Sequence, residues 1–83
     1  MTLRHFHIFS TVCKKESITK AAEELNMAQP AVSFAIRELE SYYGTKLFER
    51  MNRRLYITDA GKQLLVYADS VLAQCKEAKR RFK

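Results

Sequence analysis

Polar side chains recur at every fourth position of the segment QPAVSFAIRELE, where Gln29, Ser33 and Arg37 would share one face of a helix. A glutamine amide can pair bidentately with adenine, and a hydroxyl group can exchange hydrogen bonds with several base edges in the DNA major groove. Pro30 and Phe34 add apolar atoms to the same face, and such atoms can contact the methyl group of thymine. These five side chains could therefore read a base sequence if the rest of the chain holds this face outward.

Residue types that support catalysis or metal binding are sparse in this chain. His5 and His7 lie two positions apart, about 200° around a helix axis, so they cannot share a metal ion. The sequence offers no serine–histidine–aspartate set, no paired acids and no glycine-rich phosphate loop, and we predict neither an enzyme nor a metal site. Cys13 and Cys75 match no metal or redox spacing, which predicts reduced thiols in a cytoplasmic protein.

Three helices are predicted around the polar face. Apolar residues at helical spacing predict a first helix over Leu3–Lys15, and Ser17 is suited to cap a second helix over Ile18–Leu25. After the short break NMA, Pro30 opens a third helix that ends at Gly44, because proline is tolerated in a first turn and glycine after a last one. Two helices joined by so short a turn meet at a steep angle. This is the helix-turn-helix arrangement, which presents its second helix to the major groove.

A β-hairpin is predicted immediately after the third helix, over residues 44–58. The segments KLFER and RLYIT are short and rich in apolar and β-branched residues, and they flank MNR, in which Asn52 is the turn residue. The hairpin is basic, since it carries Lys46, Arg50, Arg53 and Arg54. A basic hairpin beside a recognition helix is typical of a wing that reaches DNA phosphates or a narrow minor groove.

Contacts to DNA phosphates would come from cations, hydroxyl groups and helix N-termini. The candidates near the starts of the first two helices and on the hairpin are Thr2, Arg4, Thr19, Lys20 and Arg50. Arg50 has an equally weighted alternative, which is an ion pair with Glu40 or Glu49 that would hold the wing. Arg54 is assigned to a phosphate contact or a solvated charge rather than to base reading.

A long final helix is predicted after Thr58, which would cap it, with Asp59 favourable in its first turn. Its apolar stripe consists of Leu64, Leu65, Ala68, Val71, Leu72, Cys75, Ala78 and Phe82. The helix would extend about 35–40 Å, further than so small a domain can cover. Leu65, Leu72 and Phe82 would then be exposed in a single chain, which predicts dimerisation through the stripe. The alternative is that the stripe packs back on its own domain.

The net charge of +6 is distributed unevenly along the 83 residues, which form one small domain. Residues 1–43 hold five Lys/Arg and five Asp/Glu, whereas residues 44–83 hold ten Lys/Arg and four Asp/Glu. A basic half indicates a polyanionic partner, with nucleic acid first and an anionic membrane surface second, or simply a solvated surface. No apolar run is long enough to span a bilayer. Binding to a membrane surface needs one strongly apolar face opposite a basic one. Only the final helix comes close to this pattern, and since its stripe is assigned to dimerisation we expect no membrane partner.

The combination of ITKAAEELNMAQPAVSFAIRELE, LFER and ITDAG resembles the N-terminal DNA-binding domain of LysR-type transcriptional regulators over residues 3–61. The resemblance implies a mainly α-helical fold, a winged helix-turn-helix with a three-helix core and a two-stranded wing over residues 1–58. The helix-turn-helix would occupy residues 18–37 and the wing about 45–58. A linker helix over residues 59–83 would follow and pair with its twin in a dimer.

The same resemblance implies roles for individual side chains. The family's base-reading positions and its wing arginine correspond to Gln29, Pro30, Ser33 and Arg53. Ala28 stands where the family usually has serine or threonine, so a helix cap and a phosphate contact would be lost. Phe34 and Ala35 stand where the family often has arginine or lysine followed by glutamine, which argues against direct guanine contact at Phe34. The alternatives for Phe34 are a thymine methyl group, a sugar or an atypical contact with a protein.

The partners implied by the resemblance are double-stranded DNA and a second copy of the chain, in the cytoplasm of a bacterium. Two helices over residues 29–43 would enter successive major grooves of an inverted-repeat operator. A full-length regulator would add a C-terminal domain for a small-molecule effector, could form a tetramer and could contact RNA polymerase, while this chain itself needs no cofactor. The alternatives are a module that dimerises and binds an acidic protein through the wing, and a binder of anionic membranes.

Overall fold

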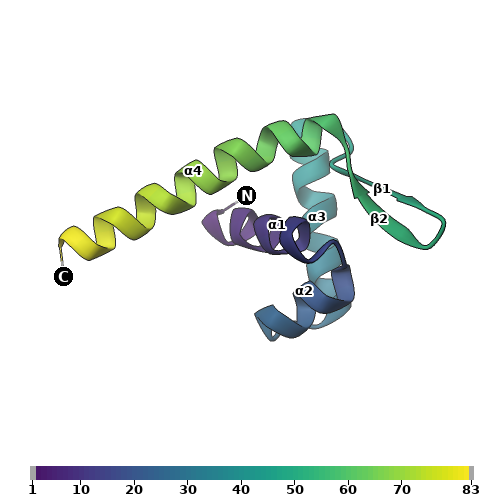
Figure 1. The fold of residues 1–83 in the computed structure, drawn as a ribbon, viewed down its shortest axis with the longest axis horizontal. Coiled ribbons are helices and arrows are strands. Elements are labelled where there is room, and N and C mark those ends of the chain that lie inside the picture. The colour runs from purple at the N-terminus through teal and green to yellow at the C-terminus, as the bar shows by residue number, and fades with distance from the viewer. Residues whose placement is uncertain (1, 83) are drawn as a thin grey trace.

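Four helices and a two-stranded antiparallel hairpin make up residues 2–82, the part of the chain that this computed structural model describes. Their order is α1 Leu3–Lys15, α2 Ile18–Leu25, α3 Gln29–Tyr43, β1 Phe48–Met51, β2 Arg54–Ile57 and α4 Asp59–Arg81. In Figure 1, α1, α2 and α3 lie together, the hairpin projects to one side of them and α4 runs away to the other side. The predicted winged helix-turn-helix with a long final helix is confirmed. Met1 and Lys83, at the ends of the predicted domain and helix, lie outside the described residues.

The core forms where the other helices enclose α1. This helix packs against α2, α3 and α4. The largest fully buried side chains are Phe9, Val12, Val32, Leu39 and Leu47. The rings of Phe9 and Phe48 lie with their centroids 5.5 Å apart, so the first residue of β1 joins the same core. Because the core holds α3 from one side, the opposite side of α3 remains open to a partner.

The turn between α2 and α3 follows from its residues. Asn26 ends α2 with a φ of 55°, a left-handed conformation that asparagine tolerates better than most residues. The Met27 N–H donates a hydrogen bond to the Ala22 carbonyl at 3.0 Å, which satisfies one of the free carbonyl groups at the end of α2. Pro30 lies in the first turn of α3, and Ala28 provides no side-chain cap. Asn26 and Pro30 thus let the chain end α2 and begin α3 with only three residues between them.

The wing consists of β1, β2 and their turn (residues 48–57), and its turn is tighter than predicted. Met51 pairs with Arg54, so Asn52 and Arg53 alone form the turn. The motif MNR predicts a turn that includes Met51, and the structure corrects this by assigning Met51 to β1. Asn52 and Arg53 have φ values of 51° and 63°, as a type I′ turn requires at both central positions. Arginine rarely adopts positive φ, so Arg53 is strained.

Glu40 fixes the wing to the end of α3. Its Oε2 accepts hydrogen bonds from the backbone N–H groups of Leu47 and Phe48, at 2.8 and 3.3 Å. Within residues 2–82, Arg50 is in no ion pair with Glu40 or Glu49, so that alternative is not realised. The carboxylate holds the wing through backbone amides, and the Arg50 guanidinium forms no ion pair with any residue of the described part of the chain.

Gly61 is required at the junction between the wing and α4. The first turn of α4 is capped by Thr58, whose Oγ1 accepts from the Gly61 N–H at 3.0 Å and donates to the Lys46 carbonyl at 2.7 Å. A Cβ at Gly61 would overlap the Leu47 carbonyl oxygen and lie 2.6 Å from Ile57 Cγ1. A glycine in this first turn therefore lets α4 begin directly against the wing.

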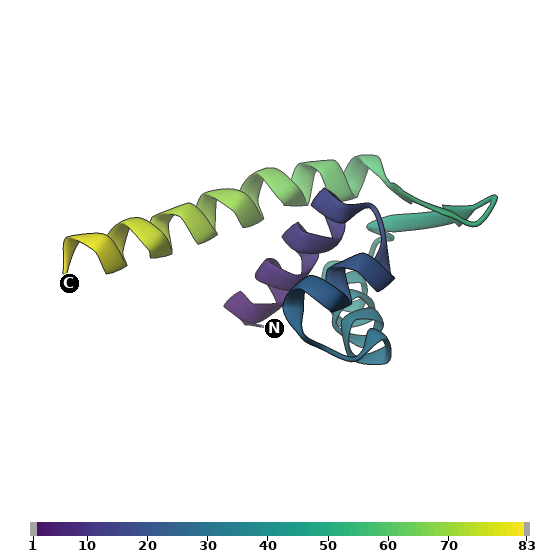
Figure 2. The same cartoon turned by 60° about the horizontal axis from the view of Figure 1, so that its bottom comes forward.

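The final helix packs along α1 for only part of its length. The buried Ser10 hydroxyl donates to Asp69 Oδ1 at 2.8 Å, which links the two helices. Leu65 and Leu72 are half-buried against the core, which corrects the prediction that a single chain would expose them, whereas Phe82 is 86% exposed. No helix within residues 2–82 is long and apolar enough to cross a membrane. In Figures 1 and 2 the yellow end of α4 extends past the start of α1, so the apolar stripe continues beyond the body of the domain.

Candidate nucleic-acid interface

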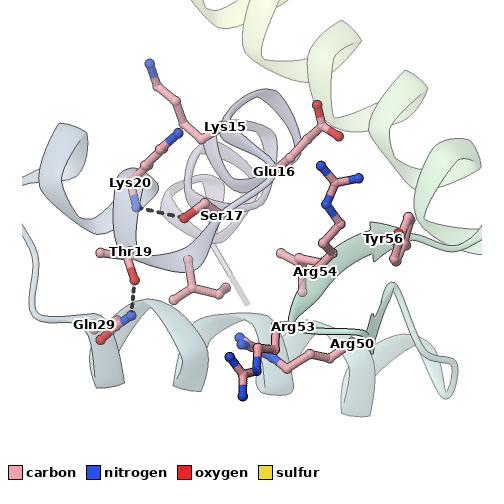
Figure 3. Close-up of a pocket in the computed structure, with 12 residues that line it drawn as sticks. Lys15, Glu16, Ser17, Thr19, Lys20, Gln29, Arg50, Arg53, Arg54 and Tyr56 are labelled. Carbon is pink, nitrogen blue, oxygen red and sulfur yellow. Dashed lines mark hydrogen bonds between the residues drawn. The ribbon is translucent and has the colours of Figure 1, made fainter.

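An open groove of about 450 Å³ lies between the start of α2, the start of α3 and the wing (Figure 3). It brings together six of the predicted contact residues, namely Thr19, Lys20, Gln29, Arg50, Arg53 and Arg54. Lys15 makes a fifth cation among the lining residues, and Glu16 is the one acidic side chain there. The groove is therefore positively charged and suited to a polyanion.

Three arginines of the wing enter the groove without a carboxylate partner. Arg50, Arg53 and Arg54 are exposed, and none of them is in an ion pair with another residue of the described chain, 2–82. In Figure 3 the side chains of Arg50 and Arg53 extend to the same side of the wing, whereas Arg54 extends to the side of Glu16. Three cations on one small hairpin repel one another, and phosphate groups would relieve that repulsion.

Gln29 is oriented by Thr19, which belongs to the preceding helix. The Gln29 Nε2 donates a hydrogen bond to the Thr19 Oγ1, drawn as a dashed line in Figure 3. A carboxamide has two N–H donors and an acceptor oxygen, so this bond leaves one donor and the oxygen free. Those two groups are the ones that bidentate contact with adenine uses. The Thr19 hydroxyl also keeps its own hydrogen, which could be donated to a phosphate.

The outer face of α3 is open over its first two turns. Among its predicted contact residues, Gln29, Pro30 and Arg37 are exposed and Ser33 is half-buried. Phe34 is 56% exposed. The Arg37 guanidinium carbon lies 6.0 Å from the centroid of the Phe34 ring, at the outer limit of a cation–π contact. The buried side chains of α3 are Val32, Ala35, Ile36 and Leu39. The five predicted side chains thus occupy the face that the core does not use.

The start of α2 contributes a second source of positive charge. Ser17 caps the helix by accepting a hydrogen bond from the Lys20 N–H at 3.1 Å. Lys15 is paired with Glu24 at 2.8 Å, and its hydrogen bond and charge lower the pKa of the Glu24 carboxyl. Lys20 is exposed and forms no such pair with a described residue. Lys20 therefore offers the groove more available charge than Lys15.

Seven predicted contact residues do not line this groove, namely Pro30, Ser33, Phe34 and Arg37 on the outer face of α3, together with Thr2, Arg4 and Asn52. Thr2 and Arg4, at the start of α1, are not among its lining residues. The Thr2 N–H donates to Nδ1 of His5 at 3.1 Å, and His5 Nε2 lies 2.9 Å from Glu38 Oε1. Asn52 is exposed in the turn of the wing and likewise does not line the groove. Any DNA contact by Thr2, Arg4 or Asn52 would involve a separate stretch of backbone.

The sequence pattern missed Lys15 and Tyr56, which line the groove. It offered Glu40 as a residue that holds the wing, but through Arg50 rather than through backbone N–H groups. Strand alternation could have found Tyr56, because it pairs with Glu49 on the exposed face of the hairpin. No local pattern signals Lys15 or the partners of Glu40, because these depend on segments that meet only in the folded domain.

The family described as bacterial regulatory helix-turn-helix protein, lysR family, matches residues 3–62. The HTH-type transcriptional regulator CfxR of Cupriavidus necator is 45% identical over 78 residues, which are 94% of this chain and 25% of that protein. The RuBisCO operon transcriptional regulator of Allochromatium vinosum is 38% identical over 77 residues, which are 93% of this chain and 26% of that protein. The chain thus spans about a quarter of the length of these curated relatives.

Solved structures of the same fold include a complex with DNA. The crystal structure of the BenM_DBD/catB site 1 DNA complex matches with a TM-score of 0.94 and 35% identity, covering 99% of this chain and 92% of that chain. The crystal structure of CbnR, a LysR family transcriptional regulator, matches with a TM-score of 0.91 and 28% identity, covering 98% of this chain and 28% of that chain. The similarity extends over nearly all of the present chain.

Proposed function

Because the chain belongs to the lysR family of bacterial regulatory helix-turn-helix proteins, we propose that it reads an inverted-repeat operator as a homodimer. Its relatives are transcriptional regulators, and its role is DNA binding rather than catalysis. In this proposal α3 enters the major groove while the wing reaches the minor groove or phosphates. One observation carries the proposal. Gln29 and three arginines of the wing line the same groove, and these arginines form no ion pair with another residue among residues 2–82.

Base reading is assigned to the exposed face of α3, with Gln29, Pro30, Ser33, Phe34 and Arg37. A recognition helix contacts base edges with its N-terminal residues, and Gln29 is the first residue of α3. Its bond to Thr19 restricts the side chain before DNA arrives, which lowers the entropic cost of a base contact. This arrangement favours adenine at the position that Gln29 contacts.

Phosphate and minor-groove contact is assigned to the wing and the start of α2. Arg53 occupies a turn position with a φ of 63°, a strained conformation that is retained mainly where the surrounding structure or a function requires it. Arg50 and Arg53 would follow one strand of the backbone from the same side of the wing. Arg54 would bind a phosphate from the side of Glu16, and Asn52 would contact a separate stretch of backbone. Thr19 and Lys20 would bind a phosphate at the start of α2, and Thr2 and Arg4 one at the start of α1.

Dimerisation is assigned to α4. The first part of its apolar stripe, including Leu64, Leu65, Ala68, Val71 and Leu72, packs on the domain itself. Cys75 and Phe82 continue the stripe beyond the body of the domain and are exposed. A second copy that covered this overhang would bury apolar surface and relate two α3 helices by a twofold axis. The half-sites would then lie about 34–36 Å apart, one turn of DNA.

Selection of bound sites from a random duplex library tests this function. The wild-type chain and the Gln29→Ala variant are selected in parallel at physiological salt. Gln63→Ala is the matched control, because Gln63 is also an exposed glutamine but lies on α4, away from the groove. We expect an interrupted inverted repeat for the wild type and for Gln63→Ala. For Gln29→Ala we expect the preference to be lost at one symmetric pair of positions.

Two outcomes would contradict the proposal. Enrichment of no sequence by the wild type would leave only non-specific DNA association, or an acidic protein as the partner of the wing. An unchanged preference in Gln29→Ala would mean that α3 is not the base-reading element.

A further inference from the structure

Phe34 is an exposed aromatic residue beside the polar face of α3. It is 56% exposed, while the core of the domain takes only the opposite side of the helix. At 100° per residue it lies about 40° around the axis from Pro30, about 60° from Arg37 and about 140° from Gln29. The ring therefore lies at one edge of the face assigned to base reading, next to Pro30 and Arg37, and it contributes little to the core.

Arg37 lies beside the Phe34 ring on this face. Its guanidinium carbon is 6.0 Å from the ring centroid, at the outer limit of a cation–π contact. Arg37 forms no ion pair with a carboxylate among residues 2–82, and the neighbouring Glu38 lies 2.9 Å from His5. With 56% of the residue exposed, the Phe34 ring remains accessible to a partner.

We propose that the Phe34 ring contacts the C5-methyl group of a thymine in the major groove and so determines one position of the operator. This inference rests on the proposed function. A phenyl ring has no hydrogen-bond donor or acceptor, and the methyl group of thymine is the one methyl group on the four base edges. A ring held on the base-facing side of α3 thus recognises thymine by exclusion of water from that methyl group.

Helix geometry separates Phe34 from Gln29 both along α3 and around it. Phe34 is five residues after Gln29, which corresponds to about 7.5 Å along the axis and about 140° around it. The thymine contacted by Phe34 is therefore a different base from the one that Gln29 reads.

Replacement of thymine by deoxyuridine tests the inference, because it removes the methyl group and keeps every hydrogen-bonding atom. Each thymine of the selected half-site is replaced singly, and affinity is measured by fluorescence anisotropy. We expect one of these replacements to weaken wild-type binding about fourfold, as for the loss of one buried methyl group. The same replacement should have no effect on Phe34→Ala, whose fold is checked by circular dichroism.

Gln29→Ala is the control for this series, since it should retain the fourfold loss at that thymine while binding more weakly overall. The inference is overturned if no thymine is sensitive to the replacement, or if Phe34→Ala keeps the sensitivity of the wild type. Either result would leave a selected inverted repeat intact, so the proposed function would survive. Failure of the proposed function would show earlier, as the absence of any selected sequence.

Discussion

Gln29, the first residue of α3, donates a hydrogen bond from its side-chain nitrogen to the hydroxyl oxygen of Thr19, the second residue of α2. Both residues are exposed in the groove, so the bond is not part of the core. Its effect is to orient the carboxamide while leaving one N–H and the oxygen free. The two helices of the helix-turn-helix thus cooperate in presenting a single side chain.

Thr19→Val should weaken operator binding through Gln29. Valine has a similar shape but accepts no hydrogen bond, so Gln29 would lose its restriction, at a cost of about 0.5–1.5 kcal/mol in binding free energy. The measurement is a double-mutant cycle of Thr19→Val and Gln29→Ala, with affinity for the operator read by fluorescence anisotropy. We expect the loss from Thr19→Val to be smaller in the Gln29→Ala background. Equal losses in both backgrounds would show that Thr19 acts independently of Gln29, and Thr19→Ser should bind like the wild type.

Arg53→Gly should raise the stability of the fold and lower its affinity for DNA. Glycine adopts the φ of 63° without strain and asparagine–glycine suits a type I′ turn, so the free energy of unfolding should rise by up to about 1 kcal/mol. Affinity for DNA should fall, because the guanidinium is lost. Urea unfolding checks the first effect and anisotropy the second, with Arg53→Lys as the control that keeps both charge and strain. A less stable Arg53→Gly would mean that the Arg53 side chain itself stabilises the wing.

Glu40→Ala should loosen the wing. The substitution leaves the backbone N–H groups of Leu47 and Phe48 without their acceptor, and we expect the free energy of unfolding to fall by about 1–3 kcal/mol. Hydrogen exchange should be faster at both amides in native conditions. Glu40→Gln keeps an acceptor oxygen at the same place and should lose less. If the two variants exchanged these amides at the wild-type rate, the carboxylate would not be what holds the wing.

Cys13 and Cys75 should differ in reactivity toward alkylating reagents. Burial, with a smaller contribution from the charge of Asp69, raises the pKa of the Cys13 thiol to about 12, whereas Cys75 is exposed. Because the thiolate is the reactive form, iodoacetamide at about pH 8 should modify Cys75 in the folded protein and Cys13 only after unfolding. Mass spectrometry of the alkylated chain gives the two rates. Equal rates in the folded state would contradict the burial of Cys13.

The same raised pKa of Cys13 gives stability a defined pH dependence. The thiol loses its proton at lower pH in the unfolded chain than in the folded one. Its contribution to the free energy of unfolding is therefore complete below about pH 9 and is lost as the pH rises toward 12. Urea unfolding at increasing pH tests this, and Cys13→Ala should remove that part of the decrease.

Local patterns predicted the elements well where burial and capping decide them. The bounds of α1 and α2 agree with the predicted ones, because apolar spacing and the Ser17 cap act within a few residues. The positive φ of Arg53 could not be predicted so directly, since strand pairing between Met51 and Arg54 fixes the length of the turn. Pairing register depends on both strands and on the core beneath them.

Contacts between residues far apart in the sequence explain the remaining differences between the predicted and the observed structure. The carboxylate of Glu40 reaches amides seven and eight residues later only after the chain has reversed at Gly44. Periodicity predicted which side of α4 is apolar, but it did not decide that Leu65 and Leu72 pack against the core of their own domain. A stripe of one helix has the same sequence whether its own domain or a second copy covers it.

One set of titrations tests most directly whether α3 reads bases while the wing binds DNA without regard to sequence. Wild type, Gln29→Ala and Arg53→Gly are titrated against the selected operator and a scrambled duplex at several salt concentrations. For Gln29→Ala we predict a loss of about 1–3 kcal/mol on the operator alone, with the salt dependence unchanged. For Arg53→Gly we predict weaker binding to both duplexes and a salt slope lower by about one. Equal weakening of both duplexes by Gln29→Ala would contradict base reading by α3.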